Sequence, residues 1–385
     1  MRLRFKVFNK LLTLLGASIV ILIIFLYTLA KQPAADEFIT IIKENSQELT
    51  QPPTEIVPKL LNLTNFEYLI ENRLCHSYKK ELLAILIVTS YAGHDELRSA
   101  HRQAISQTKL SDLGIQRVFL LAAVPEREHF ITQSQLQNEQ KRFGDLLQGN
   151  FKEAYRNLSY KHIMGLKWSA TECRKARFII KIDDDIVYDI FQVKRYLDAL
   201  ELENPTLTSS SHLLAGYILD AKPVIRLQAN KWYVSEQEYA GNVYPDYLSG
   251  WLYITNPQTA LRLVKQSTNS PIFWIDDTWV TGILREPLAI PLQRLNSWFS
   301  ANPDFLNCCV RDLKASSLEC DLYVGPNGGD NKLLIEFLHN VEKCYYDECV
   351  KRSKQQILKN TCVGTFKRLL PDHGEANIKP FKLGR

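Results

Sequence analysis

The sequence lacks the short motifs that mark several large enzyme classes. It has no P-loop, no G-x-G-x-x-G following an apolar run and no G-x-S-x-G nucleophile elbow. Its histidines are also scattered: no metal or triad spacing joins the four at positions 94, 101, 129 and 162. P-loop nucleotide hydrolysis, dinucleotide-dependent redox chemistry and α/β-hydrolase chemistry therefore have no support in the sequence.

The chain also has little excess charge. Its 47 Lys and Arg residues against 42 Asp and Glu residues give a net charge of +5 over 385 residues. This excess is too small and too evenly spread to indicate a nucleic-acid groove, so we expect no nucleic-acid partner. With 45% hydrophobic and 23% charged residues, the chain is not disordered overall, and its length fits one large domain or two modest ones.

The sequence has a single long apolar run, residues 11–30. Twenty helical residues span about 30 Å, the thickness of the bilayer hydrocarbon. Because Arg2, Arg4, Lys6 and Lys10 precede the run, the positive-inside rule predicts a cytosolic tail (1–10), a transmembrane signal-anchor (11–30) and a lumenal body. The alternative is a signal peptide cleaved near Ala30, although a signal core is usually only about 7–15 residues long.

The segment after the anchor reads as a proline-containing lumenal stem, residues 31–74. Asn62 and Asn157 begin glycan acceptor sequons, which agree with a lumenal body. Six of the eight cysteines fall in a C-terminal extension, residues 301–385, which we expect to pack on the preceding domain. A zinc site at Cys344-x4-Cys349 has no well-spaced second pair, so lumenal disulfides are favoured, with their pairing left open.

Between these segments, apolar runs alternate with helical patterns. Residues 82–88, 118–124 and 177–182 predict buried strands, whereas residues 95–107 and 160–173 predict helices. This alternation predicts an α/β fold with a mainly parallel central sheet. We place the catalytic domain at residues 75–300.

Three aspartates, Asp183 to Asp185, directly follow the strand at residues 177–182. Adjacent carboxylates repel one another, and a divalent cation relieves that repulsion. Oxygen ligands suit Mg²⁺, Mn²⁺ or Ca²⁺, and the carboxyl end of a strand is where open α/β sheets bind ligands. The alternatives are a solvated acidic turn or an aspartate that caps the next helix. An EF-hand is excluded because its glycine and terminal glutamate are missing.

A second acidic pair, Asp276-Asp277, follows a short apolar run. An aspartate in this position can cap a helix, or it can act as a general base once tryptophans such as Trp274 and Trp279 desolvate it. Residues 244–251 mix aromatic residues with turn formers, a composition suited either to stacking on a sugar or to an ordinary packed turn.

The order of these segments resembles the β1,3-glycosyltransferases of glycosyltransferase family 31, over about residues 83–290. The strongest similarity runs from Glu139 to Asp185, and within it Trp168 and Cys173 lie at the family's interval. The matching blocks are Lys181 to Asp185, Lys231-Trp232, Tyr244-Pro245 with Tyr247, Ser249-Gly250, and Asp276-Asp277 through Gly282. The sequence departs from the family's pattern at Asp276, where many relatives have Glu, and at His101 and Ile105 around Arg102. Because the segment around Arg102 is altered, the identity of the donor sugar is left open.

The resemblance implies a GT-A-like nucleotide-sugar-binding fold and a role for each matched residue. Asp183 and Asp185 would hold the metal, Asp277 with Asp276 would supply the catalytic base, and the remaining residues would bind substrate. Donor binding is implied for Arg98, Arg102, Lys181 and Asp184, and acceptor or sugar binding for Trp232, Tyr244, Tyr247, Ser249 and Gly250.

The resemblance further implies an inverting, manganese-dependent β1,3-hexosyltransferase, with magnesium as the alternative metal. The donor would be a UDP-hexose carrying galactose or an N-acetylhexosamine, and the acceptor a glycan of a glycoprotein or glycolipid. We expect a single-pass type II protein of the Golgi membrane and leave a homo- or heterodimer open. The alternatives are a non-catalytic lumenal glycan-binding protein, a chaperone of a related transferase, or a metal-dependent phosphoesterase.

Overall fold

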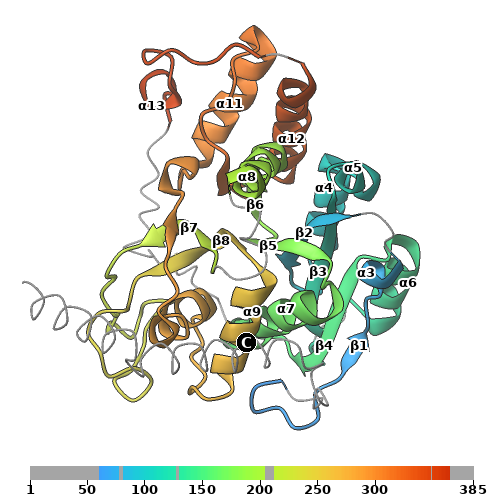
Figure 1. Ribbon diagram of the computed structural model, residues 1–385, viewed down its shortest axis with the longest axis vertical. Helices are drawn as coiled ribbons and strands as arrows, with labels where there is room; N and C mark the ends of the chain where they lie inside the picture. The colour runs from blue at the N-terminus through green and yellow to red at the C-terminus, as the bar shows by residue number, and fades with distance from the viewer. Residues whose placement is uncertain (1–59, 78–80, 127–129, 204–211, 348, 365–385) are drawn as a thin grey trace, which may run out of the picture. The chain divides into compact units, whose positions relative to one another are not determined.

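The computed structural model describes residues 60–77, 81–126, 130–203, 212–347 and 349–364 (Figure 1). The chain divides into two compact units, Met1–Val57 and Pro58–Arg385, and all described residues belong to the second. Residues 1–10, residues 11–30 and most of the predicted stem lie outside the described residues. Within the described ranges, no helix is both long and apolar enough to cross a membrane, and the anchor stays a prediction.

The described unit alternates strands and helices. The strands are β1 Tyr68–Ile70, β2 Leu82–Thr89, β3 Ile115–Ala123, β4 Leu146–Lys152, β5 Ala176–Asp183, β6 Ile186–Tyr188, β7 Leu214–Leu219, β8 Tyr247–Thr255, β9 Gln293–Arg294 and β10 Val324–Pro326. The α-helices are α3 Leu74–Ser77, α4 Asp95–Ala104, α5 Gln107–Asp112, α6 Gln133–Phe143, α7 Leu158–Glu172, α8 Ile190–Glu203, α9 Pro257–Ser267, α10 Asp276–Thr278, α11 Pro303–Ser316, α12 Asn331–Tyr346 and α13 Leu358–Thr361. Short turns of other helix types are η1 Tyr155–Asn157, η2 Trp279–Ile283, η3 Glu286–Leu288 and η4 Asn296–Trp298.

Eight of the strands form one sheet in the order β1-β4-β3-β2-β5-β8-β7-β9. The central strands β4, β3, β2 and β5 are parallel, whereas β8 runs antiparallel to both β5 and β7. The strand order reverses between β2 and β5, and ligands bind at the carboxyl ends of strands at such a switch point. The sheet therefore confirms the predicted α/β class and its mainly parallel centre.

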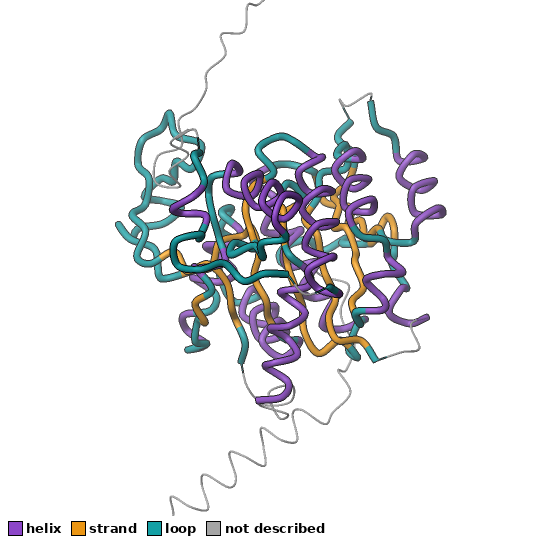
Figure 2. Tube along the Cα trace, turned by 90° about the horizontal axis from the view of Figure 1, so that it is seen from above, coloured by secondary structure: helices purple, strands orange, loops and turns teal. Residues whose placement is uncertain are grey.

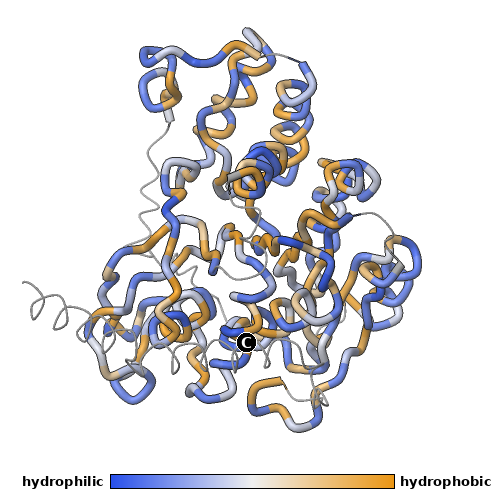
Figure 3. Tube along the Cα trace, in the orientation of Figure 1, coloured by the Kyte–Doolittle hydropathy of each residue, from blue (hydrophilic) through white to orange (hydrophobic). Residues whose placement is uncertain are grey.

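The sheet has a hydrophobic core on each face because successive side chains of a strand point to opposite faces. In β2, Ala84, Leu86 and Val88 join one cluster, and Ile85 and Ile87 join the other. The first cluster includes residues of α4, α5, α8, α11 and α12, and the second includes residues of α7 and α9; these groups lie on opposite sides of the sheet in Figure 1. Figure 2 shows the strands enclosed by helices, and Figure 3 shows apolar residues along them.

Two boundaries differ from the sequence-based expectation. The helix predicted over residues 95–107 is two helices, α4 and α5, because Ser106 accepts the Lys109 N–H and starts a new helix. The predicted stem also ends earlier than residue 74, because β1 pairs antiparallel with β4 at the edge of the main sheet. The sequence of a strand this short does not predict which strand it pairs with.

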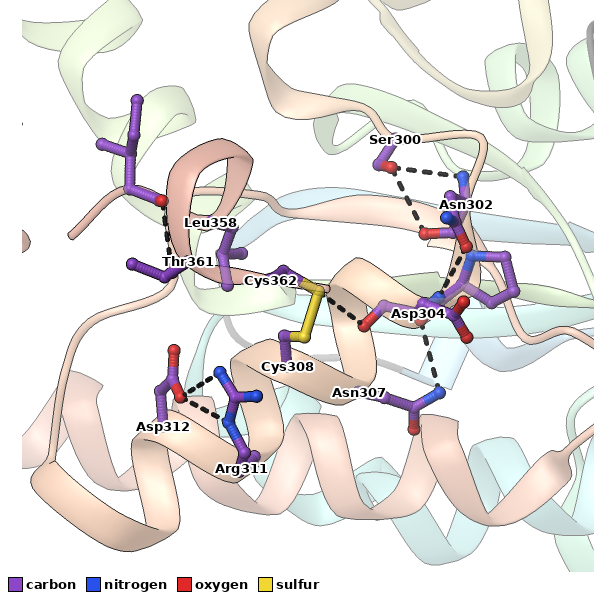
Figure 4. Close-up of a disulfide and its surroundings, with 12 residues drawn as sticks. Ser300, Asn302, Asp304, Asn307, Cys308, Arg311, Asp312, Leu358, Thr361 and Cys362 are labelled. Atoms are coloured by element: carbon purple, nitrogen blue, oxygen red, sulfur yellow. Dashed lines mark hydrogen bonds and ion pairs between the residues drawn. A yellow bond between two sulfur atoms is a disulfide. The ribbon is translucent and has the colours of Figure 1, made fainter. Parts of the chain in front are cut away.

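Helices of the predicted C-terminal extension share a hydrophobic core with the central sheet. Leu306 and Cys309 of α11 and Phe337 of α12 belong to the same core cluster as Leu86 of β2. All eight cysteines form disulfides, which confirms the disulfide prediction. The pairs are Cys75–Cys173, Cys308–Cys362, Cys309–Cys320 and Cys344–Cys349. Figure 4 shows Cys308 of α11 joined to Cys362 just after α13.

Candidate active site

The acidic triplet lies at the carboxyl end of β5, beside the end of β2. Asp183 is paired with Thr89 across the two strands, and the Asp184 N–H donates to the Thr89 carbonyl at 3.1 Å. Asp183 is half-buried and Asp185 is exposed, so both carboxylates remain accessible to a ligand. The triplet is therefore at the switch point and is not an isolated solvated turn.

A buried lysine neutralises part of this negative charge. The Lys181 ammonium, with a side chain only 1% exposed, donates to Asp183 Oδ1 at 2.6 Å and to the Gly250 carbonyl at 2.7 Å. Burial raises the pKa of Asp183 to about 7; the nearby Asp276 and Asp185 carboxylates add to this effect, and Lys181 opposes it. Burial and the neighbouring carboxylates therefore outweigh the stabilisation that Lys181 gives to the ionised form of Asp183.

Gly250 links the triplet to the second acidic pair. Its N–H donates to Asp277 Oδ2 at 3.2 Å. A Cβ atom added at Gly250 would lie 3.5 Å from Asp183 Oδ2, 3.5 Å from Asp277 Cβ and 3.2 Å from Lys181 Nζ. Only a residue without a side chain leaves this space open, and the two acidic clusters therefore face a single site.

Asp277 is held at the start of a distorted helix. Its Oδ1 accepts the adjacent Thr278 N–H at 2.7 Å, but the N-cap position is Ile275, which makes no side-chain cap bond, so the helix-cap interpretation of Asp277 is wrong. The following residues form a π-helical turn, η2, a feature often found at functional sites, and the Thr281 hydroxyl donates to the Asp277 carbonyl at 2.7 Å. Burial and the adjacent Asp276 charge raise the pKa of Asp277 to about 6, a value suited to a general base.

Asp276 points instead into a buried hydrogen-bond chain. Its Oδ2 lies 2.9 Å from His162 Nδ1, and His162 Nε2 lies 2.6 Å from the Tyr253 hydroxyl. Burial alone would raise the pKa of Asp276, but the His162 hydrogen bond and the Lys181 charge hold it below its ordinary value. Asp276 thus stays ionised beside Asp277. His162 was not predicted as a site residue, because its partners are 91 and 114 residues away.

The carboxylates at this site would supply only part of the coordination shell of a divalent cation. Among the described residues, no three His, Cys, Asp or Glu side chains are arranged to hold a metal ion. Mg²⁺-type sites, however, commonly use one or two carboxylates and complete the shell with water and substrate phosphates. Asp183 and Asp185, hard oxygen donors at an accessible strand end, match that donor set.

The two arginines expected at the donor are instead part of a buried ion network. All five N–H groups of Arg98 are used: they donate to both Glu139 oxygens, to Ser90 Oγ and to the carbonyls of Tyr91 and Ala92. With an exposure of 0%, Arg98 has no N–H left for a diphosphate. In this arrangement Arg98 positions the loop after β2 rather than contacting a ligand.

Arg102 shares that network. It donates to both oxygens of Asp145 at 2.9 and 2.7 Å and to Glu139 at 2.7 Å, and its guanidinium lies 4.0 Å from the centre of the Phe143 ring. These bonds, all from Nε and Nη2, give Arg102 a structural role, and donor binding by Arg102 stays a prediction. The sequence could not show these partners, because Glu139 and Asp145 lie 37 and 43 residues from Arg102.

Asp184, also expected at the donor, is 7% exposed and bonded to two histidines. Its Oδ2 lies 2.9 Å from His94 Nδ1, and its carbonyl lies 2.9 Å from His101 Nε2. The hydrogen bond to Asp184 raises the pKa of His94. Asp184 therefore anchors the middle of the triplet to the segment that begins α4.

The residues predicted to bind the acceptor gather into two groups. The Trp232 indole N–H donates to the Tyr155 hydroxyl at 3.0 Å, and the Lys231 ammonium lies 4.4 Å from the Tyr155 ring centre. Tyr155 is exposed, and its ring centre is 6.0 Å from that of Trp274. Together, Trp232, Tyr155 and Trp274 form an aromatic platform, of which the sequence had indicated only Trp232 for sugar binding.

The second group lies on and just before β8. Tyr244 is buried and packs with Phe273 and Tyr247 at ring-centre distances of 5.9 and 6.3 Å. Its place in the core favours the packed-turn interpretation for Tyr244, whereas Ser249 is half-buried beside Gly250.

A cavity of about 520 Å³ opens beside the triplet. It is lined by residues 93–97, Asp185, Asn327, Gly329 and Asn331. The lining from the C-terminal extension was not predicted, because the sequence offers no signal that residues 327–331 return to the end of β5.

The two sequons differ in surroundings. Asn62 is exposed, and its Oδ1 accepts the Tyr160 hydroxyl at 2.8 Å. Asn157 is half-buried, its Nδ2 donates to the Lys152 carbonyl at 2.9 Å, and Ser159 of the same sequon is fully buried. The fold thus favours Asn62 over Asn157 as a glycan site.

This site agrees with the comparisons with known proteins. The sequence profile of the galactosyltransferase family matches residues 96–296, which contain the triplet, Gly250 and the second acidic pair. The chain belongs to the galactosyltransferase family. The match confirms the resemblance and supports the prediction that the chain is a glycosyltransferase.

Curated relatives are similar over more than half of the chain. It is 27% identical to beta-1,3-galactosyltransferase brn of Drosophila melanogaster, covering 57% of this chain and 65% of that protein. It is 26% identical to human beta-1,3-galactosyltransferase 1 (62% and 71%) and 30% identical to lactosylceramide 1,3-N-acetyl-beta-D-glucosaminyltransferase B of Xenopus laevis (59% and 60%). The apo structure of WbbM bifunctional glycosyltransferase matches 69% of this chain and 52% of its own at 12% identity, with a TM-score of 0.34 too low to bear on the fold.

Proposed function

We propose that the protein is an inverting, metal-dependent β1,3-hexosyltransferase that moves galactose, or an N-acetylhexosamine, from a UDP-sugar to an acceptor glycan. The observation that carries this proposal is the position of Gly250 between Asp183 Oδ2 and Asp277 Cβ, each 3.5 Å from where a Cβ atom would lie. The proposed metal ligand and the proposed base therefore lie on either side of Gly250, near enough to act on one sugar bound between them.

Asp277 is the proposed catalytic base. Its carboxylate accepts the proton of the acceptor hydroxyl as that oxygen attacks the anomeric carbon, the bond to UDP breaks, and the configuration inverts. The raised pKa of Asp277, about 6, makes it a better proton acceptor than an ordinary aspartate while leaving it mostly ionised at neutral pH. Asp276, held ionised by His162, sustains that raised pKa through its charge.

Asp183 and Asp185 are the proposed ligands of manganese, with magnesium as the alternative. When bound there, the cation would neutralise the charge that develops on the departing diphosphate. Lys181 keeps Asp183 oriented through its 2.6 Å bond and connects it to strand β8, which carries Gly250. The exposed Tyr155 and its partner Trp232 are the proposed acceptor contacts; Trp274 is buried beneath Arg156 and supports Tyr155 from behind.

The function is tested by product analysis with the purified full-length chain. UDP-galactose, UDP-N-acetylglucosamine and UDP-N-acetylgalactosamine are each offered with a panel of glycan acceptors, with Mn²⁺ and again with EDTA. We expect UDP and a new β1,3-glycoside in equal amounts with Mn²⁺ and neither product with EDTA. Free sugar or phosphate without a glycoside would indicate a phosphoesterase, and glycan binding without turnover would indicate a non-catalytic protein.

The cellular setting is a separate part of the proposal. The apolar run at residues 11–30 and the flanking basic residues support a type II Golgi membrane protein with a lumenal catalytic domain. Co-localisation with a Golgi marker, together with a glycan on Asn62 that a glycosidase removes, is the expected result. A chain that stays in the supernatant after membrane pelleting would contradict it.

A further inference from the structure

The cavity beside Asp185 is built from two distant parts of the chain. One side is the loop after β2 and the first turn of α4, residues 93–97, and the other is the loop between β10 and α12. The second side lies beyond residue 296, where the family match ends. The C-terminal extension therefore contributes to a ligand-sized cavity that the family profile does not cover.

The extension is joined directly to the acidic triplet. Strand β10 pairs antiparallel with β6, which follows Asp185, with Pro326 opposite Ile186. The next residue, Asn327, donates its backbone N–H to the Asp185 carbonyl at 2.9 Å. The backbone position of Asp185 is thus fixed by the extension.

Asn327 also organises the cavity wall through its side chain, which is 7% exposed. Its Oδ1 accepts the Gly329 N–H at 2.9 Å, and its Nδ2 donates to Asn331 Oδ1 at 3.1 Å. The loop needs glycine at Gly328 and Gly329, where φ is +66° and +83°. Within the described residues, the Asn331 amide nitrogen donates to no other group, and the half-buried Asn331 lines the cavity.

The chemistry of the lining indicates which part of a donor it suits. Among the described residues that line the cavity, none is Lys or Arg, whereas Asp95, Glu96 and Asp185 are acidic. His94 also lines the cavity, but its Nδ1 is bonded to Asp184, which balances its charge. The three acidic side chains repel bare phosphate, whereas carboxylates and amides can exchange hydrogen bonds with ribose hydroxyls and with a base. The diphosphate then belongs at the Asp183 and Asp185 end, and the nucleoside in the cavity.

We propose that the C-terminal extension forms one wall of the nucleoside subsite, with the Asn331 amide binding the donor nucleoside and Asn327 positioning Asn331. This inference rests on the proposed function, because it assigns a part of the same donor. The extension then sets the affinity for the nucleotide and does not serve only as a stabilising cap.

The test compares the affinities of two probes, UDP and inorganic pyrophosphate, each with Mn²⁺, by calorimetry on the purified full-length chain. Asn331→Ala should weaken UDP binding about fivefold, the effect of one lost hydrogen bond, and leave pyrophosphate binding unchanged. Asn307→Ala is the matched control: Asn307 is an exposed asparagine of the same extension whose Nδ2, in the part of the chain that the structure describes, bonds only within α11, and both affinities should stay at wild-type values.

The positioning role is tested by a double-mutant cycle. Asn327→Asp keeps the oxygen that accepts the Gly329 N–H but cannot donate to Asn331, so it should weaken UDP binding in the same direction. The Asn327→Asp/Asn331→Ala double variant should then bind UDP about as well as Asn331→Ala, because both changes remove one interaction. Fully additive losses would overturn the positioning role.

The results of these experiments distinguish a failure of the nucleoside subsite from a failure of the proposed function. If wild-type protein binds UDP and Asn331→Ala binds it equally well, the nucleoside subsite is overturned and the proposed function stands. If Asn331→Ala weakens pyrophosphate and UDP by the same factor, the contact is with phosphate and the subsite is again overturned. If wild-type protein binds no UDP, both proposals fail.

Discussion

Replacing Gly250 by alanine tests whether the two acidic clusters form one site. The added Cβ atom would lie 3.2 Å from Lys181 Nζ, which is closer than ordinary van der Waals contact, so the ammonium must move by a few tenths of an ångström. That ammonium holds Asp183 at 2.6 Å, and the new methyl group also enters the space between Asp183 and Asp277. Because a misplacement of about 1 Å can cost about 10²-fold in rate, we expect kcat to fall about 10- to 100-fold.

The assay is steady-state UDP release, normalised to the folded fraction measured by circular dichroism. The expected loss of stability is modest, about 1–3 kcal/mol, as for other overpacked positions. Gly149→Ala is a suitable control, because its Cβ would crowd Phe151 and Met164 in the core, away from the acidic residues. We expect it to lower the melting temperature while kcat per folded molecule stays unchanged. A Gly250→Ala protein with wild-type kcat would refute the shared site.

Three further predictions follow from the site. Asp185→Ala should abolish transfer while the protein keeps its wild-type melting temperature; near-normal turnover would remove Asp185 from the metal site. Because Asp277 acts in its ionised form and its pKa is about 6, kcat/KM should rise with pH through about 6 and then level off. In Asp276→Asn, the lost negative charge should move that rise to lower pH, and an unmoved profile would argue against the coupling of the two aspartates. His162→Phe leaves the buried Asp276 carboxylate without its hydrogen bond and should lower the free energy of unfolding by about 2–3 kcal/mol in urea titrations, whereas an unchanged unfolding midpoint would show that the bond is dispensable.

The sequence predicted best where local pattern determines structure. The apolar runs at residues 82–88 and 177–182 are strands β2 and β5, because continuous burial on both faces requires apolar residues at every position. The apolar run at residues 177–182 also placed the acidic triplet, because the triplet directly follows that run in the sequence. The order of the family blocks placed Asp276 and Asp277 in the same site. Residues that are close together in the sequence are enough to predict these features.

The sequence predicted least where partners are far apart. Arg98 had the residue type of a phosphate ligand, yet Glu139, 41 residues away, engages it in a buried ion pair. The role of Asn327 depends on a three-residue strand that pairs with β6 more than 130 residues earlier. Such pairings follow from tertiary packing, and a single sequence carries no local signal for them.

In the proposed mechanism, Asp277 accepts a proton and takes no part in binding the donor. The decisive measurement is made on Asp277→Asn, comparing UDP-sugar affinity by calorimetry with glycoside formation by mass spectrometry. We predict donor affinity within about twofold of wild type and no detectable glycoside, because the amide keeps the shape of the side chain but cannot accept the proton. Loss of donor binding together with transfer would assign Asp277 to structure or to the metal, and full glycoside formation would contradict the proposed mechanism.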